Sequence, residues 1–256
     1  IFEGSKKQLR ATLTVFVPPG ENCEIGKLVL TNEGTAEKSF SVFSYVEFCL
    51  WNAMDDMTNF QRNFSTGEVE VHGSAIYHKT EYRERRRHYA VYGVNAPVEG
   101  FDTDRESFLG NWGDNSAPAA VTEGRSRNSI ASGWSPIGSH HLKLALAPGE
   151  SHTYIFLLGY VENPADEKWD GRPEEGRINR KPAEELLARF DSVEKADRAF
   201  AALGEYWNHL LSHFSLFSGE DKLNRMVNVW NQYQCMVTFN MSRSASYFES
   251  GIGRGM

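Results

Sequence analysis

Short strand-like segments follow one another between residues 10 and 161, and in residues 10–17 hydrophobic and polar positions alternate with the period of two that marks a half-buried β-strand. The segments are 10–17, 25–31, 39–48, 67–71, 75–77, 88–94, 141–147 and 152–161. Turn residues separate them, as at Asn32-Glu33-Gly34 and Pro148-Gly149. We expect the first three strands to form an antiparallel meander. Strands at this spacing without helices between them favour a large antiparallel β-sandwich.

One long segment interrupts this series of strands. Residues 95–135 are rich in Gly, Asn, Ser and Asp and carry the aromatic residues Phe101, Phe108, Trp112 and Trp134. The composition predicts a loop. A loop of this length in a compact domain is usually functional or forms an interface.

The periodicity changes to that of helices after a charged, proline-containing connector at residues 162–181. A short helix is expected at 182–190, a longer one after a cap at Ser192, and a third after a cap at Ser218. The third carries an apolar stripe at helical spacing, formed by Leu223, Met226, Val227, Trp230, Tyr233 and Val237. Such a broad stripe must pack against a large apolar surface.

The helical period fails beyond Asn240, where serines and glycines surround Arg243 and Arg254. Two guanidinium groups among hydroxyls and glycine N–H groups suit bidentate binding of a phosphate or of sugar hydroxyls. Composition alone leaves a second interpretation open, in which this is an ordinary helix exit whose arginines pair with surface carboxylates.

A second polar cluster surrounds Arg62, with Asn59, Gln61, Asn63, Ser65 and Thr66 beside it. These side chains could hydrogen-bond sugar hydroxyls, or they could form a surface loop with one ion pair. The basic run at residues 83–87 is interpreted as a solvated or interface strand, because its side chains alternate between faces and the surrounding chain is acidic.

The composition is that of a globular protein that can bury a core, with 40% hydrophobic and 24% charged residues among 256. A net charge of −7 without a basic tail argues against nucleic acid and anionic membranes as main partners. We expect a cytoplasmic protein, because no apolar run reaches the length of a membrane span and the start has no signal-peptide pattern. The three cysteines lack metal-site or disulfide spacing and are interpreted as core thiols, and we expect no metal at His209 and His213.

Several stretches together resemble the cellobiose phosphorylases, in family 94 of the glycoside hydrolases. They are EFCLWNA at 47–53, NFQRNFSTGE at 59–68, YHKTEYRERR at 77–86, NVWNQYQCMVTFN at 228–240, SRSAS at 242–246 and GIGRGM at 251–256. The resemblance implies a mainly β chain with α-helices at its carboxyl end: a β-sandwich at 1–165 that is incomplete at its start, linker helices at 166–217, and the first helix and substrate loop of an (α/α)6 catalytic barrel at 218–256.

The same resemblance implies an activity and its participants. Cellobiose phosphorylases cleave cellobiose with inorganic phosphate and inversion to α-glucose 1-phosphate and glucose, without a cofactor, and act as homodimers. Arg243 matches the position that holds phosphate, Arg254 one that binds the transferred glucosyl unit, and Arg62 one that reaches the acceptor sugar from the neighbouring subunit.

The catalytic group itself is expected elsewhere. An inverting hydrolase needs a carboxylic acid and a carboxylate base, whereas phosphate is already an anionic nucleophile, so a phosphorolytic site needs one general acid and cations that hold the phosphate. The family's general acid is an aspartate downstream of the motif at Met256, so no carboxylate of this chain is nominated as catalytic. Two other classes stay open: a non-catalytic carbohydrate-binding sandwich, and a scaffold or dimerisation module.

Overall fold

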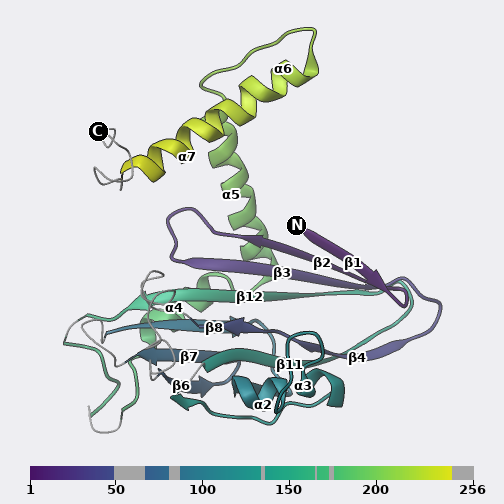
Figure 1. Cartoon of the computed structure of the whole chain (residues 1–256), viewed down its shortest axis with the longest axis vertical. Coiled ribbons are helices and arrows are strands. Elements are labelled where there is room, and N and C mark those ends of the chain that lie inside the picture. The colour runs from purple at the N-terminus through teal and green to yellow at the C-terminus, as the bar shows by residue number, and fades with distance from the viewer. Residues whose placement is uncertain (49–66, 81–86, 134–135, 165, 173–175, 244–256) are drawn as a thin grey trace. The chain divides into compact units, whose positions relative to one another are not determined.

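The computed structural model describes residues 1–48, 67–80, 87–133, 136–164, 166–172 and 176–243. The chain divides into two compact units, residues 1–200 and 201–256. The first unit consists mainly of antiparallel β-sheets, and the second is helical (Figure 1).

The larger sheet of the first unit has eight strands in the order β1-β2-β3-β12-β8-β7-β6-β10, and every pairing is antiparallel. The strands are β1 (Phe2–Lys6), β2 (Leu9–Phe16), β3 (Cys23–Asn32), β6 (Gly67–His72), β7 (Ala75–Thr80), β8 (His88–Val94), β10 (Ser132–Gly133) and β12 (Ser151–Glu162). The central strand β8 is buried along its whole length, because both faces of the sheet are covered there.

The smaller sheet is built around β11 (Pro136–Leu146), which pairs with β4 (Lys38–Phe43), β5 (Val46–Glu47) and β9 (Gly100–Asp104). Ser44 separates β4 from β5. Its N–H donates to the carbonyl oxygen of His140 at 3.0 Å, and its hydroxyl lies 3.1 Å from His140 Nδ1. The segment predicted as one strand at 39–48 is therefore two short strands, held to β11 at the break by this serine.

The two sheets pack face to face around one hydrophobic core. The larger sheet contributes Leu30, Tyr92, Val94, Tyr154 and Phe156, and the smaller sheet contributes Leu142 and Leu146. Phe40, Val42, Val46 and Phe48 pack against this cluster, as the alternation of residues 39–48 predicts. The expected antiparallel β-sandwich is confirmed.

Helix α4 (Lys181–Arg189) covers the outer face of the larger sheet. Two glycines of the sheet make room for it: a Cβ at Gly93 would lie 2.6 Å from Leu187 Cδ2, and one at Gly159 would lie 2.8 Å from Leu186 Cδ2. Helix α5 (Val193–Leu211) follows, with the predicted Ser192 cap confirmed by a 3.3 Å hydrogen bond from Lys195 N to Ser192 Oγ.

The connector between β12 and α4 is fixed to the larger sheet by Lys79 of β7. The side chain of Lys79 is almost fully buried, and its Nζ lies 3.1 Å from Glu68 and 2.9 Å from Glu70 and donates to the carbonyl oxygen of Gly176. Glu70 in turn accepts from the backbone N–H of Ile178 at 2.9 Å. A charged network therefore holds this part of the connector, next to the fully buried Ile178.

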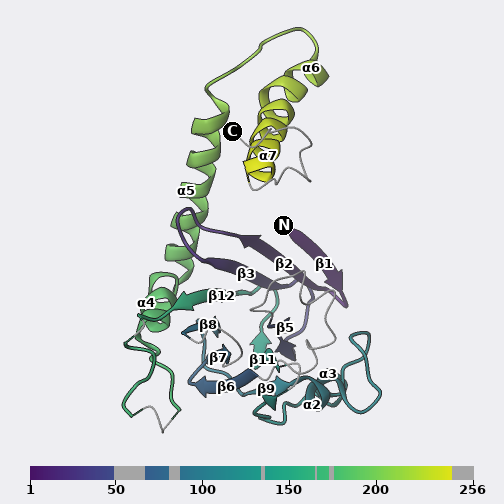
Figure 2. The same cartoon turned by 60° about the vertical axis from the view of Figure 1, so that its left-hand side comes forward.

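Two predictions about the sandwich are wrong. The first three predicted strands are not a meander, because β3 pairs with β2 and β12 while the third segment belongs to the smaller sheet. The long loop expected at 95–135 contains β9, β10 and two short helices, α2 (Arg105–Leu109) and α3 (Ala119–Glu123), beside β9 (Figure 2). The buried Asp102 orders its last part, because its carboxylate accepts from Arg127 N at 3.0 Å and Ser129 Oγ at 2.8 Å.

The helical unit contains α6 (Asp221–Arg225), the π-helical segment η3 (Met226–Asn231) and α7 (Gln232–Arg243) in direct succession. Glu220, not the predicted Ser218, caps α6, with a 3.2 Å hydrogen bond from Lys222 N to its carboxylate. Ser218 instead accepts from Glu220 N at 3.2 Å. The helix also continues past Asn240, where the sequence period fails, as far as Arg243.

Candidate functional site

The three arginines predicted as ligand-binding residues lie at the edge of the described structure or beyond it. Arg243 is the last residue of α7, and its side chain lies outside the described residues. Arg62 and Arg254 also lie outside them. The structure therefore fixes the helix that leads to Arg243, and the roles of all three arginines stay predictions.

Three side-chain amides attach this helix to the segment before it. Asn224, Asn228 and Gln232 are spaced four residues apart and lie on one side of the helix. Asn224 Oδ1 accepts from Ser218 N at 2.8 Å and its Nδ2 donates to Ser218 O at 3.0 Å. The three residues will be called the amide ladder.

The other two members of the amide ladder bind further back along the same segment. Asn228 Oδ1 accepts from Leu216 N at 2.7 Å and Nδ2 donates to Leu216 O at 2.9 Å, while Gln232 Nε2 donates to Phe214 O at 2.7 Å and Leu211 O at 3.0 Å. Backbone groups left without partners after the end of α5 are satisfied in this way. The amide ladder thus fixes α6, η3 and α7 relative to residues 211–218.

The apolar stripe of this helix is largely open within the described part of the chain. Leu223, Met226, Trp230 and Tyr233 are 42%, 53%, 56% and 40% exposed. The ring of Tyr233 lies 6.3 Å from that of Trp207 on α5. An apolar surface of this extent on a helix indicates a face that packs against further protein.

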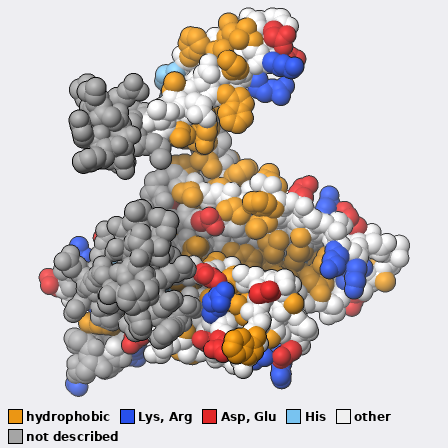
Figure 3. Space-filling view, viewed as in Figure 1, with side chains coloured by type: hydrophobic (Ala, Val, Ile, Leu, Met, Phe, Trp, Pro, Cys, Tyr) orange, Lys and Arg blue, Asp and Glu red, His pale blue; other side chains and the backbone are white. Residues whose placement is uncertain are grey.

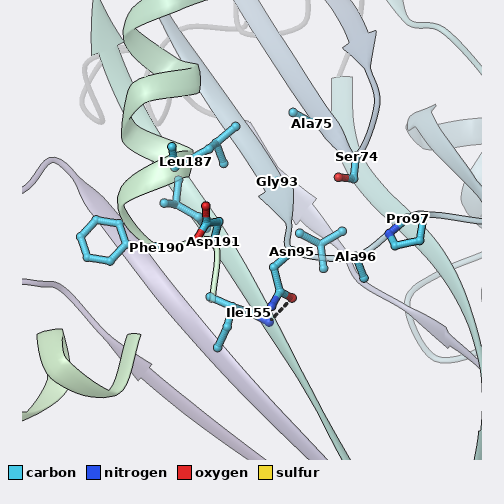
Figure 4. A pocket seen from close by; sticks show the side chains of 13 residues that line it. Ser74, Ala75, Gly93, Asn95, Ala96, Pro97, Ile155, Leu187, Phe190 and Asp191 are labelled. Carbon is cyan, nitrogen blue, oxygen red and sulfur yellow. Dashed lines mark hydrogen bonds between the residues drawn. The ribbon is translucent and has the colours of Figure 1, made fainter. Parts of the chain in front are cut away.

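The sandwich has a cavity of about 350 Å³ on its outer face, between the end of α4 and strands β8 and β12 (Figure 4). Leu187, Phe190 and Ile155 give it an apolar floor. Asn95 Oδ1 accepts from Ile155 N at 2.8 Å, and Asp191 pairs with Lys195 at 2.8 Å. Since the side chains of Asn95 and Asp191 have partners within the fold, they add little specific recognition to this cavity, which Ser74 also lines.

A second cavity, of about 320 Å³, opens between the two sheets where the smaller sheet ends. Leu13, Val15, Leu28 and Tyr92 of the larger sheet line it together with Val42 of the smaller sheet. Hydrophobic side chains gather along this hollow in Figure 3. It is a continuation of the sandwich core rather than a site with convergent polar groups.

A third cavity, of about 300 Å³, lies beside α2 and has a different character. Charged residues Asp104, Arg105 and Glu106 line it together with Leu109, Gly110, Trp112 and Gly113. The side chain of Trp112 is fully exposed at 104%. Arg105 Nε donates to Glu47 Oε1 at 3.1 Å.

Four histidines are buried in the sandwich unit, His78, His88, His140 and His141, and the pKa values of His78 and His140 fall furthest. His78 stacks on Phe48 with ring centroids 5.0 Å apart, and His140 lies 4.8 Å from Tyr92. Burial lowers the pKa of His78 to about 4, with a smaller contribution from His88, and burial lowers the pKa of His140 to about 3. Both are therefore neutral core residues near pH 7.

The remaining titratable groups give no sign of metal chemistry in the described ranges, where no group of three or more His, Cys, Asp or Glu could hold an ion. His209 and His213 approach each other through ring edges at 4.9 Å. Cys23 is buried, which raises its pKa to about 11, but Cys235 is exposed, so its interpretation as a core thiol is wrong. Cys49 lies outside the described residues, as does the basic run at 83–86.

Across the described residues, no helix combines the length and the apolar character needed to cross a membrane.

Sequence reasoning missed the amide ladder and the cavity beside α2. The amide ladder could have been found from Asn224, Asn228 and Gln232, because polar amides at four-residue spacing beside an apolar stripe indicate a specific partner. The cavity could not, because it depends on helix α2, which the composition of residues 95–135 does not predict.

Family comparisons divide the chain in two. Residues 1–193 match the family model "Glycosyl hydrolase 94, supersandwich domain", and residues 206–256 match "Glycosyl hydrolase 94 superfamily, catalytic domain". The first match covers the sandwich, α4 and the start of α5. The second covers the amide ladder, α7 with Arg243 at its end, and the segment with Arg254 that the sequence predicts to be a loop.

Curated relatives are phosphorylases. An N,N'-diacetylchitobiose phosphorylase from Vibrio proteolyticus is 29% identical over 268 residues, covering 100% of this chain and 30% of the relative. A solabiose phosphorylase from Paenibacillus borealis is 24% identical over 244 residues, covering 94% and 29%.

Among solved structures, a putative kojibiose phosphorylase from the human microbiome aligns with a TM-score of 0.48 and 9% identity, over 79% of this chain and 21% of the other. This chain spans less than a third of the length of the curated relatives named above. Because the supersandwich model matches most of its residues, the chain belongs to family 94 of the glycoside hydrolases.

Proposed function

We propose that this chain forms the sandwich and the beginning of the catalytic domain of an inverting disaccharide phosphorylase. The observation that carries the proposal is the catalytic-domain match over residues 206–256, the part that contains α7 and the arginine loop. The names of the relatives support it, since each of those reported above is a phosphorylase. A non-catalytic binding or dimerisation module would not need that loop.

The proposed reaction transfers a glycosyl unit from a sugar to phosphate. A phosphate oxygen attacks the anomeric carbon from the face opposite the glycosidic oxygen, and the carbon–oxygen bond electrons leave with the second sugar, which takes a proton from a general acid. A β-linked disaccharide gives an α-sugar 1-phosphate by this inversion. No cofactor is required, because the nucleophile is already an anion.

The arginines hold the participants of this reaction. In the proposal Arg243 binds the phosphate with its planar guanidinium, Arg254 binds the transferred sugar, and Arg62 reaches the acceptor sugar of the other subunit in a homodimer. The amide ladder supports Arg243 through α7, because it fixes the helix whose last residue is this arginine. The general acid is proposed outside this chain.

The preferred substrate is the finer part of the proposal. The motifs of the chain resemble cellobiose phosphorylases, so cellobiose, giving α-glucose 1-phosphate and glucose, is the first candidate. N,N'-diacetylchitobiose is the second, because two relatives that cover 96% or more of the chain carry that name. The two sugars share the β-1,4 linkage and differ at the second carbon of each ring.

A substrate panel tests the proposal. The full-length protein is incubated with phosphate and each disaccharide, and the sugar 1-phosphate is measured. We expect release from cellobiose at least tenfold faster than from N,N'-diacetylchitobiose. The reverse order would replace the substrate and keep the reaction class, whereas release of free sugars without phosphate consumption would overturn phosphorolysis.

A further inference from the structure

The third cavity combines one fully exposed aromatic side chain with several charged ones. Trp112 is 104% exposed, and Asp104, Arg105 and Glu106 line the same cavity of about 300 Å³. Other exposed hydrophobic residues in this part of the fold are aliphatic, such as Val121 and Ile130. A fully exposed indole buries little apolar area on folding, so its whole face is accessible for stacking on a ligand.

The loop presents the indole in a fixed way. Trp112 has a φ of 64°, a left-handed conformation that a bulky residue rarely adopts. The neighbouring Gly113 is required by close packing, since a Cβ there would lie 2.2 Å from the carbonyl oxygen of Leu109. Gly113 N donates to Gly110 O at 3.0 Å and closes the turn. Trp112 thus occupies a position where asparagine or glycine would fit with less strain, and strained positions of this kind cluster at functional sites.

The polar groups of the cavity complement the indole. Arg105 donates its Nε to Glu47 Oε1 at 3.1 Å, and a guanidinium carries further N–H donors besides Nε. Asp104 Oδ2 accepts from Ser107 N at 2.7 Å, and the carboxylate has further acceptor capacity. Hydrogen-bond donors of Arg105 and acceptors of Asp104 lie in the same cavity as the flat apolar ring of Trp112. This combination matches a ligand that has one apolar face and a rim of hydroxyl groups.

A pyranose with equatorial hydroxyls has these properties, because its axial C–H groups form an apolar face and its hydroxyls form a polar rim. We propose that Trp112 and the cavity beside α2 form a binding site for β-linked gluco-configured sugars, separate from the loop with Arg243 and Arg254. The indole stacks on one sugar ring, and Arg105, Asp104 and Glu106 hydrogen-bond its hydroxyls. The site binds sugar without phosphate and does not depend on the proposed reaction.

The test follows the indole N–H signal of Trp112 in ¹⁵N-labelled protein, assigned by its loss in Trp112→Phe. Cellotriose is added without phosphate. We expect the Trp112 signal to shift progressively with sugar, and transfer of saturation from protein to the axial sugar protons to fall at least fivefold in Trp112→Ala. Because Trp112 is fully exposed, both variants should fold, and Ile130→Ala, at another exposed hydrophobic residue, is the matched control.

Two further variants separate this site from the arginine loop. Arg105→Gln should weaken cellotriose binding at Trp112 at least threefold, whereas Arg243→Ala should leave the Trp112 shift unchanged. A shift lost in Arg243→Ala would place the sugar at the arginine loop and overturn the proposal. A Trp112 signal that does not shift when cellotriose is added would also overturn the proposal. So would a signal that shifts with protein concentration instead, because that would show that a second copy of the chain covers the indole.

Discussion

Asn228 holds the backbone of Leu216 with both ends of its amide, accepting from the N–H at 2.7 Å and donating to the carbonyl oxygen at 2.9 Å. This reciprocal pair joins the π-helical segment to the chain that precedes it. It replaces the pairing that a regular helix or strand would have given Leu216.

Asn228→Ala should loosen the helical unit. Removing the amide leaves the N–H and C=O of Leu216 without their partners, which costs about 1–3 kcal/mol. Hydrogen exchange of the Leu216 amide should accelerate by at least tenfold. The exposed Asn231, three residues further on, is the matched control, and equal exchange rates in Asn228→Ala and Asn231→Ala would show that the pair contributes nothing.

Lys79→Met should destabilise the sandwich by about 3 kcal/mol, because Glu70 would keep its charge in a largely buried position without its cation. Lys143→Met is the control, because Lys143 is 61% exposed and pairs with Glu99 at the surface, where an ion pair contributes little to stability. Urea unfolding gives both values. The double variant Lys79→Met/Glu70→Gln should recover part of the loss, and a single variant as stable as wild type would refute the ion pair's role.

Acid should weaken the sandwich through His78 and His140. Their native pKa values, about 4 and about 3, lie below the value of about 6.5 in an unfolded chain, so the unfolded state binds more protons below about pH 6.5. The free energy of unfolding should therefore fall as pH decreases from about 6.5 towards 4, by up to about 1.4 kcal/mol per pH unit for each histidine, and should not depend on them above about pH 7.5.

Urea titrations at several pH values check this. His140→Gln should be less stable at pH 7 but show a shallower decline between pH 6.5 and 4. His72→Gln, at a largely exposed histidine, should keep the slope of the wild type. An unchanged slope in His140→Gln would mean that other groups cause the acid sensitivity.

Arg243→Ala in the full-length protein should raise the KM for phosphate and lower kcat, with little change in the KM for the disaccharide. A lost charge-assisted contact to the nucleophile costs about 2–4 kcal/mol, or roughly 30-fold to 1000-fold in rate. Arg254→Ala should instead impair binding of the transferred sugar, also in synthesis from the sugar phosphate. Arg225→Ala, on α6, is the control. Wild-type constants in both loop variants would reduce the loop to a structural role.

The chain studied alone should self-associate through the apolar stripe, because Leu223, Met226, Trp230 and Tyr233 are 40–56% exposed. Trp230→Gln should lower the average mass seen by sedimentation at high concentration, whereas Ile130→Gln on the sandwich should not. A chain that stays monomeric at high concentration would contradict this expectation.

Some features of this protein follow from the sequence by itself. The strands Leu9–Phe16 and His88–Val94 form close to the predicted positions. The first has alternating hydrophobic and polar residues and the second is rich in β-branched and aromatic residues, and both patterns favour a β-strand over a helix. The cap at Ser192 and the shared face of Phe40, Val42, Val46 and Phe48 follow from the same local rules. The family is also readable from motifs, which do not depend on the fold.

Tertiary structure decided the rest. The strand at Lys38–Phe43 joins the smaller sheet because β12 occupies the edge of β3, a long-range pairing that no local pattern encodes. The Gly- and Asn-rich segment 95–135 contains the helices α2 and α3. Asp104 caps α2, and the buried residues Phe108 of α2 and Ala120 of α3 anchor the two helices. Glu220 displaces Ser218 as a cap because Ser218 is held by Asn224. The strand pairing joins residues far apart along the chain, whereas the contact between Asn224 and Ser218 spans six residues. Each of them overrides a local preference that is worth about 1 kcal/mol or less.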